Sequence, residues 1–168
     1  MAIVHLGAKR VQGTKSDRLS DSLGSSVDGT NTGITLDTTN EKLGTGCYSF
    51  DGTDDKVTLG TASDWAFLND KSTDWTIAWW HKNTLGSTSN GKALFKTAGG
   101  GGSDDGFYID VRTSQGLRAG FQGSNGSAGG NAVWNTVLPT DTSVWTHFAI
   151  VCDISESKVA LYKNGTLV

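Results

Sequence analysis

The sequence predicts an all-β protein built from many short antiparallel strands. Glycine is frequent, with 23 of 168 residues, whereas proline and methionine occur once each. No long segment repeats apolar residues at the helical period, while several short segments alternate apolar and polar residues with period two. Short strands joined by glycine-rich turns have this composition. A chain of this length suits one domain with a sizeable core.

The first 46 residues are expected to hold little regular structure. Residues 2–6 (AIVHL) are predicted to form a strand, and residues 11–46 are polar with few large apolar side chains. Such a stretch is typical of a long loop or of an arm that reaches a neighbour, and one short strand is expected near 33–37. We therefore expect a strand and a polar arm over 1–28, and the folded domain over 29–168.

Strand patterns become clear after Gly46. Apolar and small polar residues alternate over 48–50 and again over 57–59. The stretch Asp51–Asp55 between them is acidic and contains glycine, which is a turn signal. These segments are predicted to be two strands joined by that turn.

A short helical turn and a long aromatic strand are expected next. Residues 62–70 are compatible with one helical turn, with Ser63 or Asp64 as its N-cap. Residues 75–80 (WTIAWW) are largely apolar on both faces, which is typical of a central strand covered on both sides.

A hairpin is predicted in the middle of the chain, after a strand at 92–97. Residues 107–112 and 117–122 each alternate apolar with polar residues, and residues 113–116 join them. The predicted hairpin has one face toward the core and one polar face. Residues 123–132 are rich in glycine and serine and are expected to be a flexible loop.

The C-terminal segment predicts a second hairpin. Residues 145–153 and 158–162 have strand patterns, and Asn164-Gly165 is a strong signal for a tight hairpin turn. Only residues 166–168 follow that turn, so its return strand is expected to be short.

Three of these segments together resemble a known superfamily. They read GCYSFDGTDDKVTLG from Gly46, STDWTIAWWHK from Ser72 and WTHFAIVCDISESKVALYKNGTLV from Trp145. In this order they resemble the concanavalin A-like lectin/glucanase superfamily, in particular its laminin-G-like jelly rolls. The resemblance covers residues 29–168 and implies an antiparallel jelly-roll β-sandwich. Because one such fold hosts many functions, the resemblance is only weak evidence for a particular function.

The resemblance also implies which residues pack the core and how the domain ends. The tryptophans that match core positions of the family are Trp75, Trp79, Trp80 and Trp145. The two sheets are expected to pack through Phe50, Val57, Leu59, Ile77, Trp79, Phe107, Ile109, Phe121, Phe148, Ile150 and Leu161. The family's closing strands have no counterpart here. We therefore expect further chain, the N-terminal strand or a neighbouring subunit to complete the sheet.

Charge and hydropathy argue against two classes of partner. The net charge is −3 and the 14 Lys and Arg residues are scattered, so nucleic-acid binding has little electrostatic support. No apolar run approaches about 18 residues, so membrane insertion is not expected. The N-terminus (MAIVHLGAKR) lacks the pattern of a signal peptide. The expected location is extracellular or on a virion surface, without a leader in this sequence.

Catalysis is not expected. Retaining glucanases of the superfamily use a Glu-x-Asp-x-x-Glu strand with two carboxylates about 5–5.5 Å apart. This chain has two glutamates, Glu41 and Glu156, and neither lies in such a motif. The three histidines, His5, His81 and His147, have no Gly-x-Ser-x-Gly elbow to accompany them.

Two acidic loops are candidates for binding Ca²⁺. Asp51, Asp54 and Asp55 cluster in one turn, and Asp104 and Asp105 lie in another loop. Calcium takes about six to eight oxygen ligands, mainly from carboxylates and carbonyls, without a fixed sequence spacing. The alternative is that these residues only cap turn amides and face solvent. No pair of Cys or His residues has the spacing of a zinc site.

The polar face of the predicted central hairpin is the candidate sugar-binding surface. Aromatic side chains stack on sugar rings, and polar groups bind the sugar hydroxyls. The candidate ligand-binding residues are Tyr108, Asp110, Arg112, Arg118, Gln122 and, as an exposed platform in the loop that follows, Trp134. The alternative is that this face is the solvated side of a sandwich sheet.

Three further residues have alternative roles. Cys47 and Cys152 are either two buried thiols or one inter-strand disulfide, which would need Cα atoms about 4.4–6.8 Å apart. His81 stands where the family usually has an aliphatic residue, and we expect it to be half-buried and hydrogen-bonded.

The sequence thus predicts a non-catalytic binding or adhesion module with a glycan as its ligand and Ca²⁺ as its one expected cofactor. The alternative is a structural subunit of a virus particle or an extracellular filament, in which the jelly roll is a surface tile. Such a subunit would self-associate through the 1–46 arm or the 163–168 edge.

Overall fold

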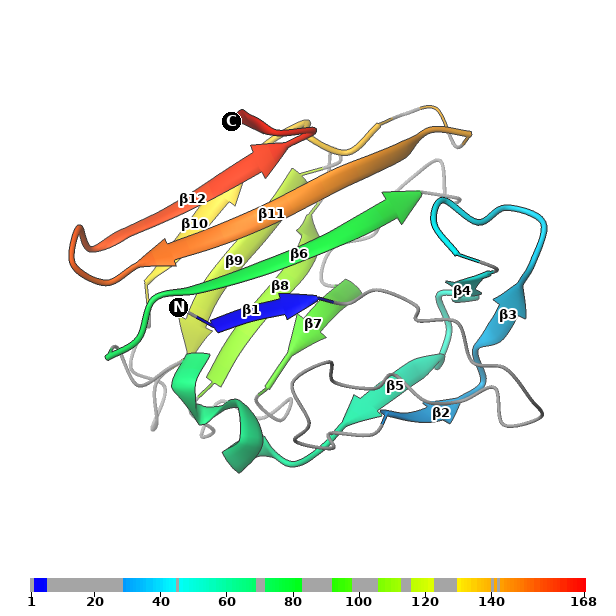
Figure 1. The fold of residues 1–168 in the computed structure, drawn as a ribbon, viewed down its shortest axis with the longest axis horizontal. Helices are drawn as coiled ribbons and strands as arrows, with labels where there is room; N and C mark the ends of the chain where they lie inside the picture. The colour runs from blue at the N-terminus through cyan, green and yellow to red at the C-terminus, as the bar shows by residue number, and fades with distance from the viewer. Residues whose placement is uncertain are drawn as a thin grey trace. The chain divides into compact units, whose positions relative to one another are not determined.

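Strands form nearly all of the regular structure in the computed structural model (Figure 1). The structure describes residues 2–5, 29–44, 46–68, 72–82, 92–97, 106–112, 116–122, 130–139, 141 and 143–168. By its internal contacts the chain divides into two units. The sandwich unit comprises Met1–Val4 and Trp65–Val168, and the N-terminal unit comprises His5–Asp64. Most of the predicted polar arm, residues 6–28, lies outside the described residues.

Two sheets form the layers of the sandwich unit. The five-stranded sheet has the order β1 (Ala2–His5), β6 (Trp75–Lys82), β11 (Trp145–Asp153), β12 (Lys158–Lys163) and β13 (Thr166–Leu167). The four-stranded sheet has the order β10 (Asn131–Trp134), β9 (Gly116–Gln122), β8 (Gly106–Arg112) and β7 (Lys92–Lys96). In Figure 1, β6, β11 and β12 lie in front of β8, β9 and β10. The pairings of β6 to β13 are antiparallel, which confirms the predicted sandwich.

The core lies between these sheets, because every second side chain of each strand points inward. Trp75 and Ile77 of β6 are 1% exposed, and Phe107 of β8 and Phe148 of β11 are fully buried. The rings of Trp75 and Phe107 meet edge to face with centroids 4.7 Å apart. Each such apolar side chain contributes about 1.5–3 kcal/mol when buried. The predicted inward positions of β8, β9, β11 and β12 are confirmed by four further core members, Ile109, Leu117, Ile150 and Leu161.

Two of the tryptophans expected in the core lie on the opposite face. Trp80 and Trp145 are half-buried and have the outward parity of β6 and β11. The Trp80 ring packs against His147 of β11 at a centroid distance of 5.2 Å. Period-two alternation dictates this outcome, since Trp79 already points inward and its neighbour must point outward.

The N-terminal unit contains two antiparallel two-stranded sheets. β2 (Gly29–Thr32) pairs with β5 (Lys56–Leu59), and β3 (Thr35–Asp37) pairs with β4 (Cys47–Ser49). Two short strands therefore occupy the region in which one was expected. Gly33 and Ile34 lie between β2 and β3 in the sequence, and residues 50–55 lie between β4 and β5.

Three residues predicted for the sandwich core belong to the N-terminal unit instead. Phe50 is 49% exposed, and Val57 and Leu59 are half-buried in β5. Their strand pairs with β2 and not with a strand of the sandwich, so the prediction that they join its core is wrong.

The predicted helical turn is a 3-10 helix, η1 (Ala62–Leu68), but its cap differs from the prediction. Thr61 precedes the helix, and both its backbone N–H and its hydroxyl donate to Asp64 Oδ2, at 2.7 and 2.8 Å. Asp64 thus reaches back from inside the first turn, as the acidic partner of a capping box does. These hydrogen bonds lower the pKa of Asp64.

The two ends of the sandwich-unit chain lie at different places in the five-stranded sheet. β1 is next to β6, whereas β12 and β13 are at the far edge. The N-terminal strand therefore does add to this sheet, as one of the expected arrangements has it, but at the β6 edge and not beside β13. The predicted turn is confirmed, because Asn164 and Gly165 have φ of 50° and 81° and join β12 to β13.

Two further findings concern the cysteines and the helices. Neither Cys47, which is half-buried, nor Cys152, which is buried, forms a disulfide. Within the described residues, no helix has the length and apolar character needed to cross a membrane.

Candidate functional site

The polar face of the β8–β9 hairpin carries an ion pair at its centre. Asp110 and Arg118 are directly opposite each other in the ladder. Arg118 donates from Nε to Asp110 Oδ1 at 3.1 Å, and a second bond joins its Nη2 to Asp110 Oδ2. Asp110 is only 6% exposed, so the fork of the guanidinium supplies the hydrogen bonds that this buried carboxylate requires. The same contact raises the pKa of Arg118.

Tyr108 lies beside this pair and rests on a glycine. The Arg118 guanidinium carbon is 4.7 Å from the centroid of the Tyr108 ring, which is a cation–π contact. Gly120 is opposite Tyr108 in the ladder. A Cβ at Gly120 would lie 2.5 Å from the Tyr108 hydroxyl oxygen and 2.9 Å from Cβ of Asn131. The tyrosine can therefore lie over the strand only because residue 120 has no side chain.

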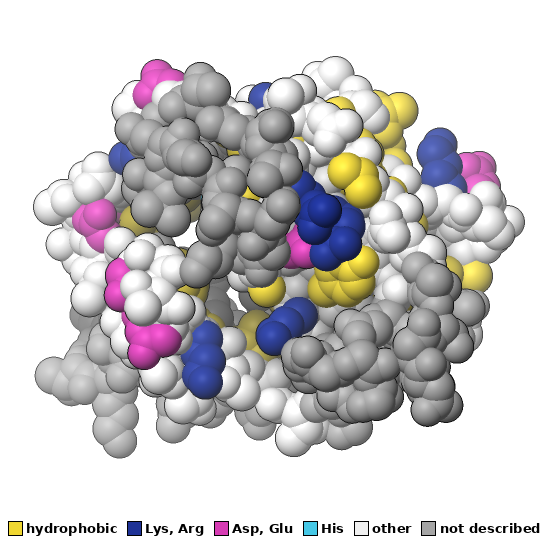
Figure 2. Space-filling view, turned by 180° about the vertical axis from the view of Figure 1, so that it is seen from behind, with side chains coloured by type: hydrophobic (Ala, Val, Ile, Leu, Met, Phe, Trp, Pro, Cys, Tyr) yellow, Lys and Arg dark blue, Asp and Glu magenta, His cyan; other side chains and the backbone are white. Residues whose placement is uncertain are grey.

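The same face extends across all strands of the four-stranded sheet. Val133 of β10 pairs with Arg118 and is 48% exposed, while Lys96 of β7 pairs with Tyr108. Figure 2 views the molecule from this side and shows basic side chains around an acidic one, next to apolar side chains. These two flanking residues were not among the predicted ones, because only the strand register shows that they are neighbours of the hairpin.

Three of the six predicted ligand residues are thus brought into contact: Tyr108, Asp110 and Arg118. Arg112 is half-buried at the end of β8 and opposite Gly116. Gln122 ends β9, and its side chain lies outside the described residues.

The prediction that Trp134 is an exposed residue in a loop is wrong. Trp134 is the last residue of β10, where it pairs with Leu117, and it packs half-buried against the core. Its strand neighbour Val133 points outward instead. The glycine-rich run before residue 131 concealed this short strand from pattern reading.

The cluster has hydrogen-bonding capacity left for a ligand. A guanidinium has about five N–H groups, and the bidentate contact with Asp110 uses two of them. The Tyr108 hydroxyl both donates and accepts. The face can therefore hold an oxygen-rich molecule by hydrogen bonds, with an aromatic ring beside it.

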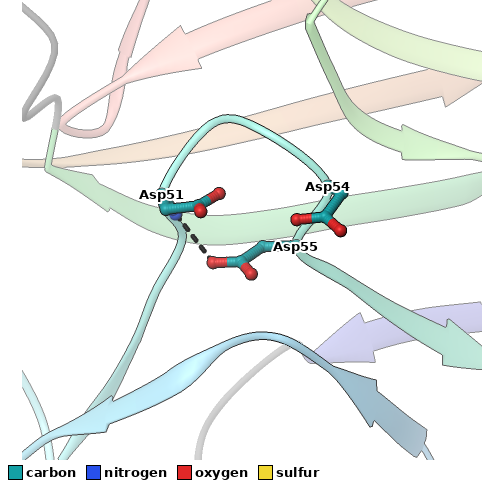
Figure 3. Close-up of side chains that lie close together, drawn as sticks. All are labelled: Asp51, Asp54 and Asp55. Carbon is teal, nitrogen blue, oxygen red and sulfur yellow. Dashed lines mark hydrogen bonds between the residues drawn. The ribbon is translucent and has the colours of Figure 1, made fainter.

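The predicted acidic turn brings its three carboxylates together. Oxygens of Asp51, Asp54 and Asp55 all lie within 4.8 Å of one another, as Figure 3 shows. Two of these oxygens also cap the turn. Asp51 N–H donates to Asp55 Oδ2 at 2.7 Å, and Thr53 N–H donates to Asp51 Oδ1 at 2.7 Å.

Gly33 lies directly against this turn. Its φ is 81°, and a Cβ there would collide with Asp55 Oδ1. The Asn31 side chain holds the facing bend through hydrogen bonds with N–H and C=O of Ile34, both at 3.1 Å. The glycine thus allows Asp55 to sit where it caps Asp51.

Hard oxygen donors of this kind fit Ca²⁺, although three carboxylates alone do not complete its shell of about six to eight oxygens. Carbonyls or water would have to supply the remainder. The capping bonds also match the alternative, in which the aspartates only stabilise the turn. The second predicted acidic pair, Asp104 and Asp105, lies outside the described residues.

Neither glutamate lies in the Glu-x-Asp-x-x-Glu motif of the retaining glucanases. Glu41 and Glu156 are both exposed and belong to different units. The nearest charged partner of Glu156 is Lys158, at 4.0 Å.

His81 lies in a group of buried polar atoms without partners. Among the described residues, Trp79 Nε1, His81 Nε2 and Thr146 Oγ1 are buried and make no hydrogen bond. The expectation that His81 is half-buried is confirmed. Its Nε2 makes no hydrogen bond, and the expected hydrogen bond of the ring is not tested at Nδ1. Burial lowers the pKa of His81 to about 4, so the ring is neutral at pH 7. A buried polar group without a partner costs about 1–3 kcal/mol.

Comparison with known proteins bears on the whole fold. The family model described as concanavalin A-like lectin/glucanases superfamily, of the laminin G type, matches residues 51–168. Among solved structures, the chain is similar to residues 221–444 of an S-layer domain-containing protein from Clostridium thermocellum ATCC 27405. The TM-score is 0.54 and the identity 19%, with 95% of this chain and 67% of the other covered. This likeness concerns the fold alone. The comparison with curated proteins gives no match.

Proposed function

Because the chain belongs to the concanavalin A-like lectin/glucanases superfamily, we propose that it is a non-catalytic module that binds a carbohydrate. The family supports a binding role in general. The observation that carries the carbohydrate assignment is the contact of Tyr108, Asp110 and Arg118 on the polar face of β8 and β9. A sugar has an apolar ring face and many hydroxyls, and this cluster offers an aromatic ring next to fixed donors.

Each member of the cluster has a distinct role in this proposal. Arg118 donates hydrogen bonds to sugar hydroxyls, and Asp110 fixes the direction of its guanidinium. Tyr108 provides the stacking surface, and Val133 extends the apolar part of the face. Nothing in this arrangement moves a proton, which is consistent with binding without hydrolysis.

The test is a glycan array followed by titration calorimetry on the best ligand. Tyr108→Ala and Arg118→Met are each expected to weaken binding about tenfold or more, because a stacked ring or a charge-assisted bond contributes about 1.5–3 kcal/mol. Tyr162→Ala is the matched control, since Tyr162 is half-buried in the other sheet. Equal losses in all three variants, or binding to no glycan, would refute the assignment.

We propose Ca²⁺ at the acidic turn as an accessory ion held by Asp51, Asp54 and Asp55. The support is the convergence of their oxygens within 4.8 Å, which places three negative charges together. Calcium is expected to raise the melting temperature, and Asp54→Asn is expected to reduce that increase. Asp141→Asn is the control, because Asp141 lies in a single-aspartate turn that its side chain caps. A melting temperature that is insensitive to Ca²⁺ would leave the aspartates as turn caps.

A second candidate function is a structural subunit of a surface layer, a filament or a virus particle. Two observations favour it: the fold likeness to an S-layer domain-containing protein, and the exposed apolar residues Leu167 and Val168 at β13 of the five-stranded sheet. Leu167 in the short strand β13 is 54% exposed, and Val168 after it is 50% exposed. Light scattering and electron microscopy would detect assemblies, and Leu167→Lys is expected to abolish them. A chain that stays monomeric at high concentration would eliminate this candidate.

Both candidates place the protein outside the cell or on a virion surface, and we propose that location. Fractionation of the native host or particle with an antibody to the chain would test it.

A further inference from the structure

One end of the sandwich interior holds three polar atoms that the described residues leave unbonded. Trp79 and His81 are two positions apart on β6, so they share a face. That face is the inner one, because Trp75 and Ile77 on the same parity are 1% exposed. Thr146 is directly opposite His81 in the β6–β11 ladder and is 1% exposed.

The three side chains are therefore close neighbours that do not bond to each other. Residues opposite each other in an antiparallel ladder have Cβ atoms about 4.5–5.5 Å apart, and diagonal neighbours about 7–8 Å. Phe148 contacts both aromatic members, with ring centroids 5.5 Å from Trp79 and 6.4 Å from His81. Nevertheless Trp79 Nε1, His81 Nε2 and Thr146 Oγ1 all lack a hydrogen-bond partner in the described chain.

Three unsatisfied polar groups in one place would cost a large part of the small net stability of a folded domain. Native proteins meet such groups with internal water, and a buried water typically makes about three hydrogen bonds. Here the donors and acceptors are complementary to one water oxygen. The indole N–H only donates, the neutral imidazole Nε2 accepts, and the hydroxyl does either.

We propose that Trp79, His81 and Thr146 form an internal binding site for one water molecule. The water accepts from Trp79 Nε1–H, donates to His81 Nε2 and exchanges its remaining bond with Thr146 Oγ1. This arrangement requires the imidazole proton to be on Nδ1. The lowered pKa of His81, caused by burial, is consistent with the neutral ring that this site needs. The site joins β6 to β11 and lies apart from the polar face of the other sheet.

The first test is a crystal structure of the whole chain at high resolution. A density peak within about 3.2 Å of all three atoms is the expected result. An empty site, or direct bonds among the three side chains, would overturn the proposal.

The second test uses the sign of a stability change. Thr146→Val keeps the shape of the side chain and removes the hydroxyl. If the hydroxyl binds the water, the melting temperature is expected to fall by about 3 °C. If the site is dry, the substitution removes an unsatisfied group, and the melting temperature stays unchanged or rises.

Thr76→Val on the outer face of β6 is the matched control for threonine-to-valine exchange. A fall for Thr146→Val that is no larger than the change for Thr76→Val would contradict the water site. Either this result or the absence of a density peak is sufficient to reject it, whether or not the protein binds a glycan.

Discussion

At the scale of single residues, burial decides whether a titratable side chain needs an oppositely charged partner or stays neutral. Asp110 is almost fully buried and is matched by a guanidinium, whereas His81 is kept neutral by burial alone. The two residues lie on different sheets of the sandwich unit. Their responses to substitution and to pH should therefore be separable.

We expect the stability of the sandwich unit to fall as the pH is lowered, because of His81. Burial lowers the pKa of His81 in the folded protein to about 4, against 6.5 for the free side chain. The unfolded chain therefore binds more protons between those values, so this contribution is complete above pH 6.5 and is lost as pH falls toward 4. The full effect is roughly 3 kcal/mol. Urea unfolding across this pH range should show the slope, and His81→Phe should remove it.

Replacement of Arg118 by lysine should destabilise the protein, because it weakens the Asp110–Arg118 pair. Arg118→Lys keeps the charge but loses the bidentate fork, so unfolding free energy is expected to fall by about 1–2 kcal/mol. Lys158→Ala, which breaks the exposed pair with Glu156, is the control and should change stability by less than about 0.5 kcal/mol. Denaturant unfolding measures both. Equal effects of the two substitutions would contradict the importance of burial at Asp110.

At the scale of strands, glycines determine how side chains lie across the ladders. Gly120 makes room for Tyr108, and Gly33 makes room for Asp55. In both cases the neighbouring side chain comes from the paired strand or the facing turn. Substitution of either glycine should therefore displace a side chain on the paired strand or the facing turn.

Gly120→Ala is expected to displace the Tyr108 ring. The added Cβ would lie within 2.9 Å of both the tyrosine ring and Asn131 Cβ, and one of them must move. We expect a loss of about 1–3 kcal/mol in stability together with weaker ligand binding. Gly130→Ala is the matched control, since nothing lies within 4 Å of a Cβ there. Thermal unfolding and glycan titration of both variants would check this prediction.

Much of the sandwich unit could be predicted from the sequence, and the reasons are local. The alternation in residues 107–112 and the Asn164-Gly165 turn act over a few residues, so their patterns are readable. Strand pairing is not local: nothing in the pattern of Val57 and Leu59 indicates that their strand pairs with β2. The candidate site shows the same limit: contacts within one hairpin could be predicted, whereas contacts between separate strands could not.

The contact of Asp110 with Arg118 could be expected from a hairpin register. The part played by Lys96 and Val133 could not, because it depends on which strand borders the hairpin on each side. The strand that contains Trp134 could not be predicted either, because it follows a glycine-rich run and has too few residues to show alternation.

At the scale of the whole molecule, acid should act on the two units in different pH ranges. Aspartates cap turns in both units and have lowered pKa values because backbone and side-chain groups donate hydrogen bonds to them. They are Asp37 and Asp64 in one unit, and Asp141 and Asp153 in the other. Their stabilising contribution is present above pH 3.8 and is lost as pH falls below it.

Only the sandwich unit also contains His81, whose contribution is lost between pH 6.5 and about 4. We therefore expect the protection of amides against hydrogen exchange, taken relative to the intrinsic exchange rate at each pH, to fall first in the sandwich unit as pH is lowered. Protection in the N-terminal unit should fall only below about pH 4. Simultaneous loss of protection in both units at pH 5 would contradict this order.

The distribution of two residue types offers a way to measure how the units are arranged. All six tryptophans belong to the sandwich unit, whereas the half-buried thiol of Cys47 belongs to the N-terminal unit. Energy transfer from the indoles to a dye attached to Cys47 would depend on the distance between the two units. With Cys152 buried and so less reactive toward labels, the natural chain already carries a spectroscopic ruler for relative motion.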